Sequence, residues 1–198
     1  MSAPPAPPFL LASTSPQRRA ILEQLGLPFD VVAPRYEEDD SSGVGPVELV
    51  RIHAAGKARS VAGEEAGERP VIGVDTTVVR DSRVFGKPAG PEEAAEMLGA
   101  LGGETHEVVS GLCLLTPGWE VVEHDITRVT FRELTARDLA AYVASGEWEG
   151  RAGGYAIQGL GAALVSRIEG DYLNVVGLPA ALLIRLLASR LPGTYGFG

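Results

Sequence analysis

The chain alternates short apolar runs with segments that begin like helices, and this alternation limits the folds it can adopt. Phe9–Ala12 is an apolar run too short for a buried helix, and Ser15–Pro16 then forms a typical helix start for residues 17–25. Phe29–Ala33 and the helical segment from Pro46 to about Ala62 repeat this order. Such alternation is typical of α/β proteins, in which helices cover a central sheet.

Strand-like segments in the middle of the chain make the expected sheet mixed rather than purely parallel. Residues 106–115 and 119–131 are separated only by Thr116, Pro117 and Gly118, so we expect them to pair as a hairpin. Asp81–Ser82 forms a second expected hairpin turn, between strands at 71–79 and 84–85. Further helices are expected at 91–101, at 135–144 and from 179 onward, and a last strand at 162–168.

Length and composition exclude several classes of protein. The 198 residues fit one domain, expected to span residues 9–198 after a disordered, proline-rich tail of residues 1–8. A net charge of −9 argues against a protein that binds nucleic acid or an anionic membrane through a basic surface. The apolar stretch 178–188 is shorter than the roughly 18–20 residues of a membrane span. We therefore expect a soluble, cytoplasmic protein, with the single cysteine, Cys113, buried in a strand.

Lysine is scarce in this chain. The 17 basic residues comprise 15 arginines and only Lys57 and Lys87. A composition that favours arginine replaces lysines whose exact chemistry does not matter. The two that remain are therefore candidates for a compact point charge that a planar guanidinium does not reproduce, with chance survival as the alternative.

The turn that follows the first strand is a candidate phosphate site. The N-terminus of a helix leaves backbone N–H groups unpaired and carries partial positive charge, so it attracts phosphate. Ser13 and Ser15 add hydroxyls at this turn, and Arg18 and Arg19 add cations. An ordinary serine cap with surface arginines is the alternative interpretation.

Asp75 is a candidate catalytic or metal-binding carboxylate. It follows the apolar run Val71–Val74, so we expect it at the carboxyl-terminal edge of the sheet, where α/β proteins bind ligands. Burial of a carboxylate without a cation is costly. Lys87, between Gly86 and Pro88, can return toward it across the expected hairpin. A plain turn aspartate is the alternative.

Two further segments carry weaker signals. The acidic run Glu37–Asp40 is of a kind that is usually solvated, although one of its carboxylates can hold a divalent cation. In the glycine-rich segment Gly150–Gly159, Gln158 can read a base edge or satisfy a buried loop. The three histidines show no ligand-like spacing, and no G-x-S-x-G motif occurs. Together, the phosphate donors, lysines and carboxylates favour Mg²⁺-assisted phosphoryl transfer.

The sequence resembles the Maf family of nucleoside triphosphate pyrophosphatases from about residue 9 to residue 191. The segments that carry the resemblance follow the family's order: Leu11–Arg18, Val71–Thr76, Gly86–Pro88, Ala152–Gly159 and Gly170–Pro179. The resemblance implies a strongly twisted mixed sheet flanked by helices, two lobes with a cleft between them, and a homodimer. It also implies hydrolysis of a nucleoside triphosphate to the monophosphate and pyrophosphate, with Mg²⁺ or Mn²⁺.

The family's motifs imply roles for individual residues. Ser13 and Arg18 would hold the phosphates, and Glu38 would hold the metal together with Asp75. Asp75 would also be the general base, or the metal-linked activator, for the attacking water. The remaining matches are Lys57 and Lys87 in catalysis and Gln158 in substrate binding.

Two departures from the family's pattern and one subgroup match bear on the detail of this resemblance. Gln17 stands where many members have an arginine, so a phosphate contact is lost or supplied by Arg19. Arg151 stands where members often have a lysine. Thr76, together with Tyr155–Gln158, is similar to the subgroup that acts on dTTP and UTP. The alternatives are a pyrophosphatase for 7-methyl-GTP or another modified nucleotide, and a nucleotide-binding inhibitor of septum formation.

Overall fold

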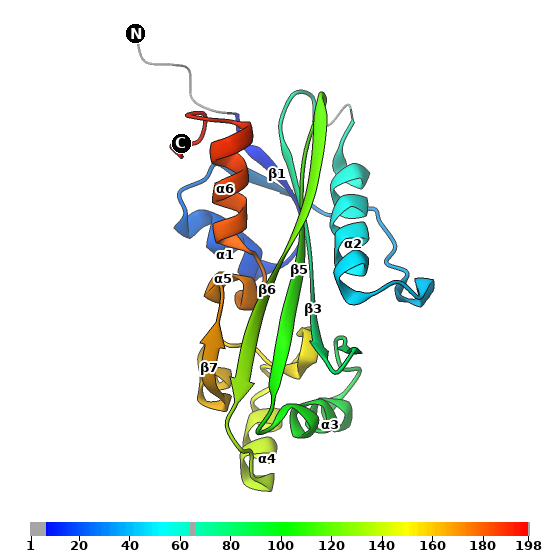
Figure 1. Ribbon diagram of the computed structural model, residues 1–198, viewed down its shortest axis with the longest axis vertical. Helices are drawn as coiled ribbons and strands as arrows, with labels where there is room; N and C mark the ends of the chain where they lie inside the picture. Colours follow the sequence, from blue (N-terminus) through cyan, green and yellow to red (C-terminus); the bar gives the residue numbers. More distant parts are fainter. Residues whose placement is uncertain (1–6, 64–65, 198) are drawn as a thin grey trace. The chain divides into compact units, whose positions relative to one another are not determined.

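A computed structural model describes residues 7–63 and 66–197, in which helices flank a seven-stranded sheet (Figure 1). The strands are β1 Phe9–Ala12, β2 Phe29–Val32, β3 Val71–Arg80, β4 Arg83–Phe85, β5 Thr105–Thr116, β6 Trp119–Phe131 and β7 Val165–Glu169. The helices are α1 Pro16–Gln24, α2 Pro46–Val61, α3 Pro91–Leu101, α4 Ala136–Ser145, α5 Tyr172–Val176 and α6 Ala180–Arg190. Short 3₁₀ helices are η1 Asp40–Ser42, η2 Ala152–Gly154 and η3 Gly159–Leu164. Residues 1–6 of the predicted tail lie outside the described residues.

The sheet is mixed, as predicted. Its order is β2-β1-β3-β5-β6-β7, with β4 paired to β3. β1 runs parallel to β2 and β3, whereas the β3–β4 and β6–β7 pairs are antiparallel. The β3–β4 turn places Asp81 and Ser82 at φ +49° and +67°, the backbone conformation of a tight two-residue hairpin. The predicted helices and hairpins are therefore confirmed in kind, with ends that differ by a few residues.

The described residues form two compact units. The first takes its residues from 7–63, 66–75, 110–125 and 177–197, and the second from Thr76–Val109 and Ile126–Val176. The long strands β3, β5 and β6 each contribute residues to both units.

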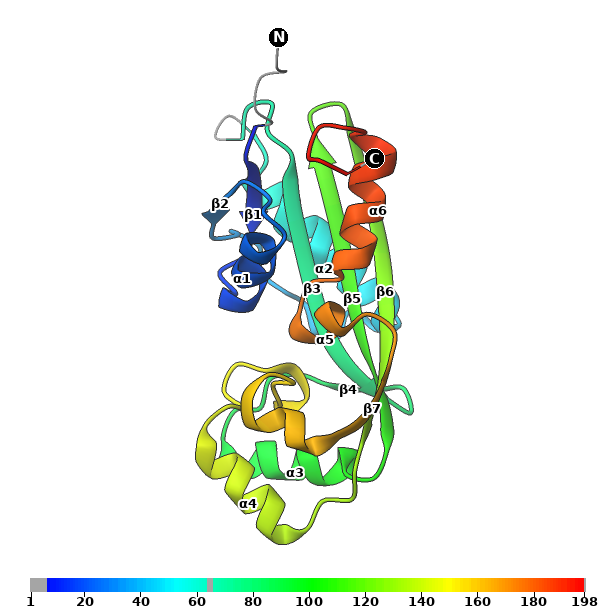
Figure 2. The same ribbon diagram turned by 90° about the vertical axis from the view of Figure 1, so that its left-hand side faces the viewer.

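In the first unit, α2 lies on one face of the sheet, and α1 and α6 lie on the other (Figures 1 and 2). Two glycines allow α2 a close approach. A Cβ on Gly73 of β3 would lie 2.1 Å from the carbonyl oxygen of Ala54, and one on Gly111 of β5 would lie 2.2 Å from that of Val50. The close approaches at Gly73 and Gly111 fix α2 against β3 and β5.

Cys113 is buried in β5, as predicted, and burial raises the pKa of its thiol to about 12.

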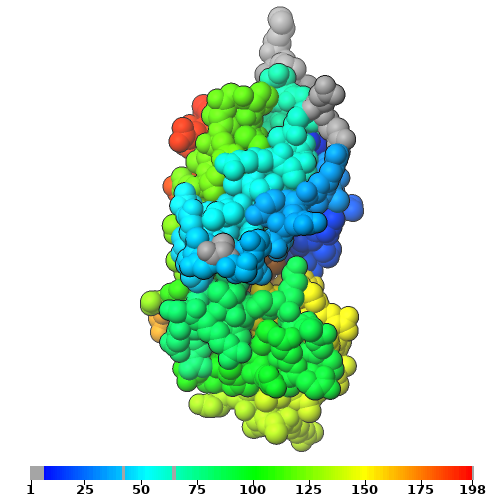
Figure 3. Space-filling view, turned by 90° about the vertical axis from the view of Figure 1, so that its right-hand side faces the viewer, coloured from blue at the N-terminus to red at the C-terminus, as the bar shows by residue number. Residues whose placement is uncertain are grey.

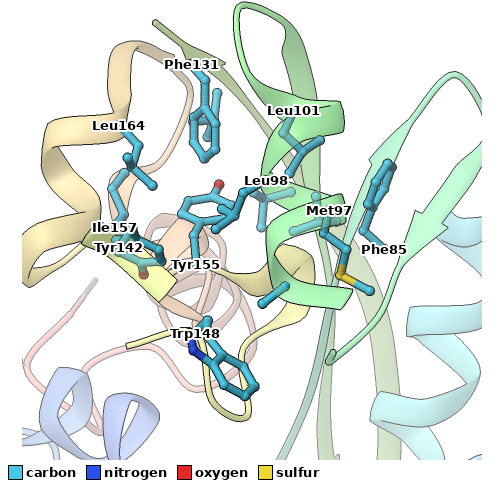
Figure 4. Packing of buried hydrophobic residues seen from close by; sticks show 14 residues of the cluster. Phe85, Met97, Leu98, Leu101, Phe131, Tyr142, Trp148, Tyr155, Ile157 and Leu164 are labelled. Carbon is cyan, nitrogen blue, oxygen red and sulfur yellow. The ribbon is translucent and has the colours of Figure 1, made fainter. Parts of the chain in front are cut away.

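The second unit has its own apolar core, drawn in Figure 4. Its centre is a group of three rings from β5, β6 and the glycine-rich segment. The rings of His106, Phe131 and Tyr155 pack edge to face, with centroids 4.8 to 5.4 Å apart. α4 begins with a reciprocal capping box between Thr135 and Asp138.

The structure corrects two local expectations and adds one helix. Ser15 is the N-cap residue of α1, but its hydroxyl donates to Gln17 Oε1 at 3.0 Å and makes no capping hydrogen bond to the helix backbone. The expected strand at 162–168 begins only at Val165, because the preceding apolar residues form η3. α5 was not predicted. Within residues 7–63 and 66–197, no helix combines the length and apolarity needed to cross a membrane.

Candidate active site

An ion cluster joins α2, β3 and the acidic loop. Lys57 Nζ lies 2.6 Å from Asp75 Oδ1 and 2.6 Å from Glu38 Oε1. The side chains of Lys57 and Asp75 are 9% and 13% exposed, and that of Glu38 is 41% exposed. A buried ammonium is stable only when it is paired, and here two carboxylates pair with it. Three residues that were singled out separately in the sequence thus meet at one nitrogen atom.

The backbone around Gly73 explains why these side chains meet. Asp75 stands in the middle of β3 rather than at the carboxyl-terminal edge of the sheet, where it was expected. The shorter strand β1, however, makes its last pair between Ala12 and Gly73. Asp75 therefore lies just beyond the end of the neighbouring strand. The close approach of α2 at Gly73 brings Lys57 within reach of it.

The β1–α1 turn forms a second polar group in the same unit. Arg18 Nη1 donates to Ser13 Oγ at 3.0 Å, and Arg18 Nε donates to the carbonyl oxygen of Gly177 at 2.9 Å. Burial lowers the pKa of Arg18, while the negative charges of Asp75 and Glu38 act in the opposite direction. The guanidinium therefore lies within electrostatic reach of the ion cluster.

Two neighbours of Arg18 are engaged elsewhere. Gln17 accepts a hydrogen bond from the Ser15 hydroxyl. The residue that stands where many Maf proteins have an arginine therefore makes only a local contact here. Arg19 Nε lies 2.8 Å from Glu23 Oε1 in an exposed pair one turn along α1. Arg18 is thus the cation of this turn that faces the carboxylates of the cluster.

The remaining predicted site residues belong to the second unit. Thr76 directly follows Asp75 in β3, whereas Lys87 and Gln158 are exposed on loops. These two loops meet, because the N–H of Gly153 donates to the carbonyl oxygen of Gly86 at 3.0 Å. Within this unit, the Gly86–Pro88 turn and the glycine-rich segment therefore form one structure.

His106 supports the glycine-rich segment and was not singled out as a site residue. Its Nε2 lies 2.9 Å from the hydroxyl of Tyr155 in the buried core. Burial, with a contribution from the charge of Arg80, lowers the pKa of His106 to about 4, so the ring is neutral. Tyr155 is therefore a buried anchor for the loop, and Gln158 is the exposed residue that it carries. His106 and Tyr155 are 49 residues apart in the sequence, so only the folded structure reveals their contact.

The carboxylates of the ion cluster suit a magnesium or manganese ion. Among the residues that the structure describes, no three His, Cys, Asp or Glu side chains form a metal-binding group. Mg²⁺ commonly takes one or two protein carboxylates and completes its shell with water and substrate phosphates. Glu38 and Asp75 supply such a pair of hard oxygen donors, so the donor set fits this ion.

Comparisons with known proteins agree with this chemistry. A family model described as Maf-like protein matches residues 8–190. A dTTP/UTP pyrophosphatase of Nitratidesulfovibrio vulgaris is 48% identical over 187 residues, which cover 93% of this chain and 89% of that protein. Proteins of the same name from Gloeobacter violaceus and Moorella thermoacetica are each 48% identical, over 90% of this chain and 94% and 93% of theirs.

Proposed function

We propose that this chain, which belongs to the Maf family, hydrolyses dTTP and UTP to the monophosphate and pyrophosphate. Its relatives named dTTP/UTP pyrophosphatase share 43–48% of their residues with it over 90% or more of its length. The observation that carries the proposal is the Lys57–Asp75–Glu38 cluster, because it is a charge arrangement suited to activating water. A protein that only binds nucleotides has no need of a positioned base.

In the proposed reaction, Asp75 takes a proton from a water molecule. The water oxygen then attacks phosphorus, the bond between the α- and β-phosphates breaks, and pyrophosphate leaves. Lys57 holds the Asp75 carboxylate in a single orientation through its 2.6 Å contact. Because this ion pair is largely buried, little solvent competes for the carboxylate.

The β1–α1 turn is the proposed binding site for the substrate phosphates. Ser13 and Arg18 offer a hydroxyl and a guanidinium, and the guanidinium can form the paired hydrogen bonds that phosphate oxygens accept. The N-terminus of α1 adds partial positive charge. We assign the triphosphate to this group of the first unit. Lys87, exposed on a loop of the second unit, is proposed as a catalytic residue.

Glu38 and Asp75 are the residues that we propose for the divalent cation, Mg²⁺ or Mn²⁺. When bound, such an ion neutralises phosphate charge and polarises the bond that is cleaved. Within the second unit, Thr76 and Gln158 are the proposed substrate-binding residues. We also propose that the enzyme acts as a homodimer in the cytoplasm, which light scattering and cell fractionation would test.

We expect kcat/KM for dTTP and UTP to exceed that for 7-methyl-GTP by at least about tenfold. Selectivity of this size needs one or two well-placed contacts to the base. The measurement is pyrophosphate release from a panel of canonical and modified nucleotides. A preference for 7-methyl-GTP would overturn the pyrimidine assignment. Binding without release of pyrophosphate would favour the septum-inhibitor alternative.

We expect Lys57→Arg and Lys87→Arg each to lower kcat/KM for dTTP by about 10²-fold. A guanidinium is longer and planar, so it displaces the positive charge from its preorganised place. The two variants should differ in stability. Lys57 is buried, so the larger arginine costs about 1–3 kcal/mol of unfolding free energy, whereas Lys87 is exposed. Kinetics and thermal midpoints of both proteins check this. Activity near that of the wild type in both would show that the lysines survive by chance.

A further inference from the structure

A buried histidine ties the acidic loop to the helix that carries Lys57. His53 lies on α2 and is 2% exposed. Its Nδ1 lies 3.0 Å from the Tyr36 hydroxyl, and its Nε2 lies 3.0 Å from Asp40 Oδ1. Tyr36 and Asp40 stand two residues before and two residues after Glu38. One imidazole therefore holds the loop on both sides of the carboxylate that contacts Lys57.

The partners of the imidazole set the direction of its hydrogen bonds. An ionised carboxylate only accepts, so Nε2–H donates to Asp40. Nδ1 forms the second hydrogen bond, with the Tyr36 hydroxyl. Both ring nitrogens are thus paired, as a buried imidazole requires.

The Tyr36 ring packs against α2 at Gly56, where no side chain blocks it. A Cβ on Gly56 would lie 2.3 Å from Cε2 of that ring. Gly56 and Lys57 follow His53 by three and four residues, so all three share one side of the helix. Figure 3 shows the loop after β2, in blue, and α2, in cyan, as one continuous surface. The loop is therefore seated beside the ion cluster.

We propose that His53 is a positioning residue that holds the Tyr36–Asp40 segment on α2 so that Glu38 meets Lys57. This role depends on the proposed function, because Glu38 belongs to the proposed metal and substrate site. The Glu38 side chain is 41% exposed, and ion pairs with an exposed partner are weak anchors by themselves. The two hydrogen bonds of a buried ring supply the anchoring that this ion pair lacks.

Two replacements of His53 test its two hydrogen bonds, because one removes both and the other keeps the bond to Asp40. His53→Leu fills a similar buried volume and suits a helix, so the protein should fold. We expect this variant to lower kcat/KM for dTTP with Mg²⁺ by about tenfold, because a misplaced carboxylate weakens the site. His53→Gln keeps a donor near the place of Nε2 and so keeps the bond to Asp40. We expect it to retain activity to within about threefold.

A double-mutant cycle distinguishes positioning of Glu38 from a general effect on the fold. In a Glu38→Gln background, His53→Leu should cost less than about twofold, because the group that it positions is already lost. His124→Leu, a matched change at an exposed histidine on β6, should change little in either background. Equal losses from His53→Leu in both backgrounds would overturn the proposal.

Amide hydrogen exchange in the nucleotide-free protein tests the same role without activity. Exchange at residues 36–40 should be at least about tenfold faster in His53→Leu than in the wild type and in His124→Leu. If the wild type releases no pyrophosphate from any nucleotide while this exchange is faster, the proposed function fails and the positioning of the loop stands. Unchanged exchange at residues 36–40 would overturn the positioning role, whatever the activity.

Discussion

Asp75→Asn is expected to lower kcat/KM for dTTP by about 10³-fold. A neutral amide cannot accept the proton of the attacking water, and loss of a general base typically costs about 10²–10⁴ in rate. The change removes one of the two carboxylates that contact Lys57, and the contact with Glu38 remains. The ammonium is therefore still paired, and the variant should fold. Steady-state kinetics and a thermal midpoint, measured side by side, check both statements.

Asp81→Asn is the matched control for this variant. Asp81 is exposed in the β3–β4 turn at φ +49°, a conformation that asparagine adopts readily. The control should keep wild-type kinetics and stability. Asp75→Asn activity within about tenfold of the wild type would assign the base to another group. A large fall in thermal midpoint would instead give Asp75 a mainly structural role.

Local sequence signals predicted most of the fold because they act over a few residues. Pro16, Pro46 and Pro91 each open a helix where the sequence analysis placed one, since proline suits the first helical position. The Asp81–Ser82 turn and the β5–β6 pair were likewise readable from turn residues between apolar runs. Residues 162–164 were misread because short apolar runs fit a strand and a helical turn equally well.

The site was predictable in its residue types but not in its contacts. Asp75 was expected at the carboxyl-terminal edge of the sheet. It is instead accessible to Lys57 because the neighbouring strand β1 is shorter than β3. The lengths of paired strands are set by the whole sheet rather than by residues near Asp75. His53 was passed over because the three histidines lack ligand-like spacing. Its partners, Tyr36 and Asp40, become neighbours only when the loop folds onto α2.

Removal of divalent cations is expected to lower turnover of dTTP by at least about 10³-fold without unfolding the protein. Glu38, Asp75 and a triphosphate together concentrate more negative charge than Lys57 and Arg18 balance, so the reaction needs a further cation. The stability argument is separate. Lys57 contacts both carboxylates, so the metal-free cluster leaves no buried charge uncompensated. The thermal midpoint in excess EDTA should therefore stay close to that in Mg²⁺, as differential scanning calorimetry would measure.

Addition of Mg²⁺ or Mn²⁺ in excess over EDTA should restore turnover, which shows that the loss is reversible. Glu38→Gln should raise the metal concentration needed for half-maximal activity, because one of the two oxygen donors loses its charge. Glu37→Gln, a matched change at the exposed preceding residue, should leave that concentration unchanged. Full turnover in excess EDTA would remove the metal from the reaction. In that case, the basic residues of the chain would have to neutralise the phosphates without a metal, and Glu38 would serve only to orient Lys57.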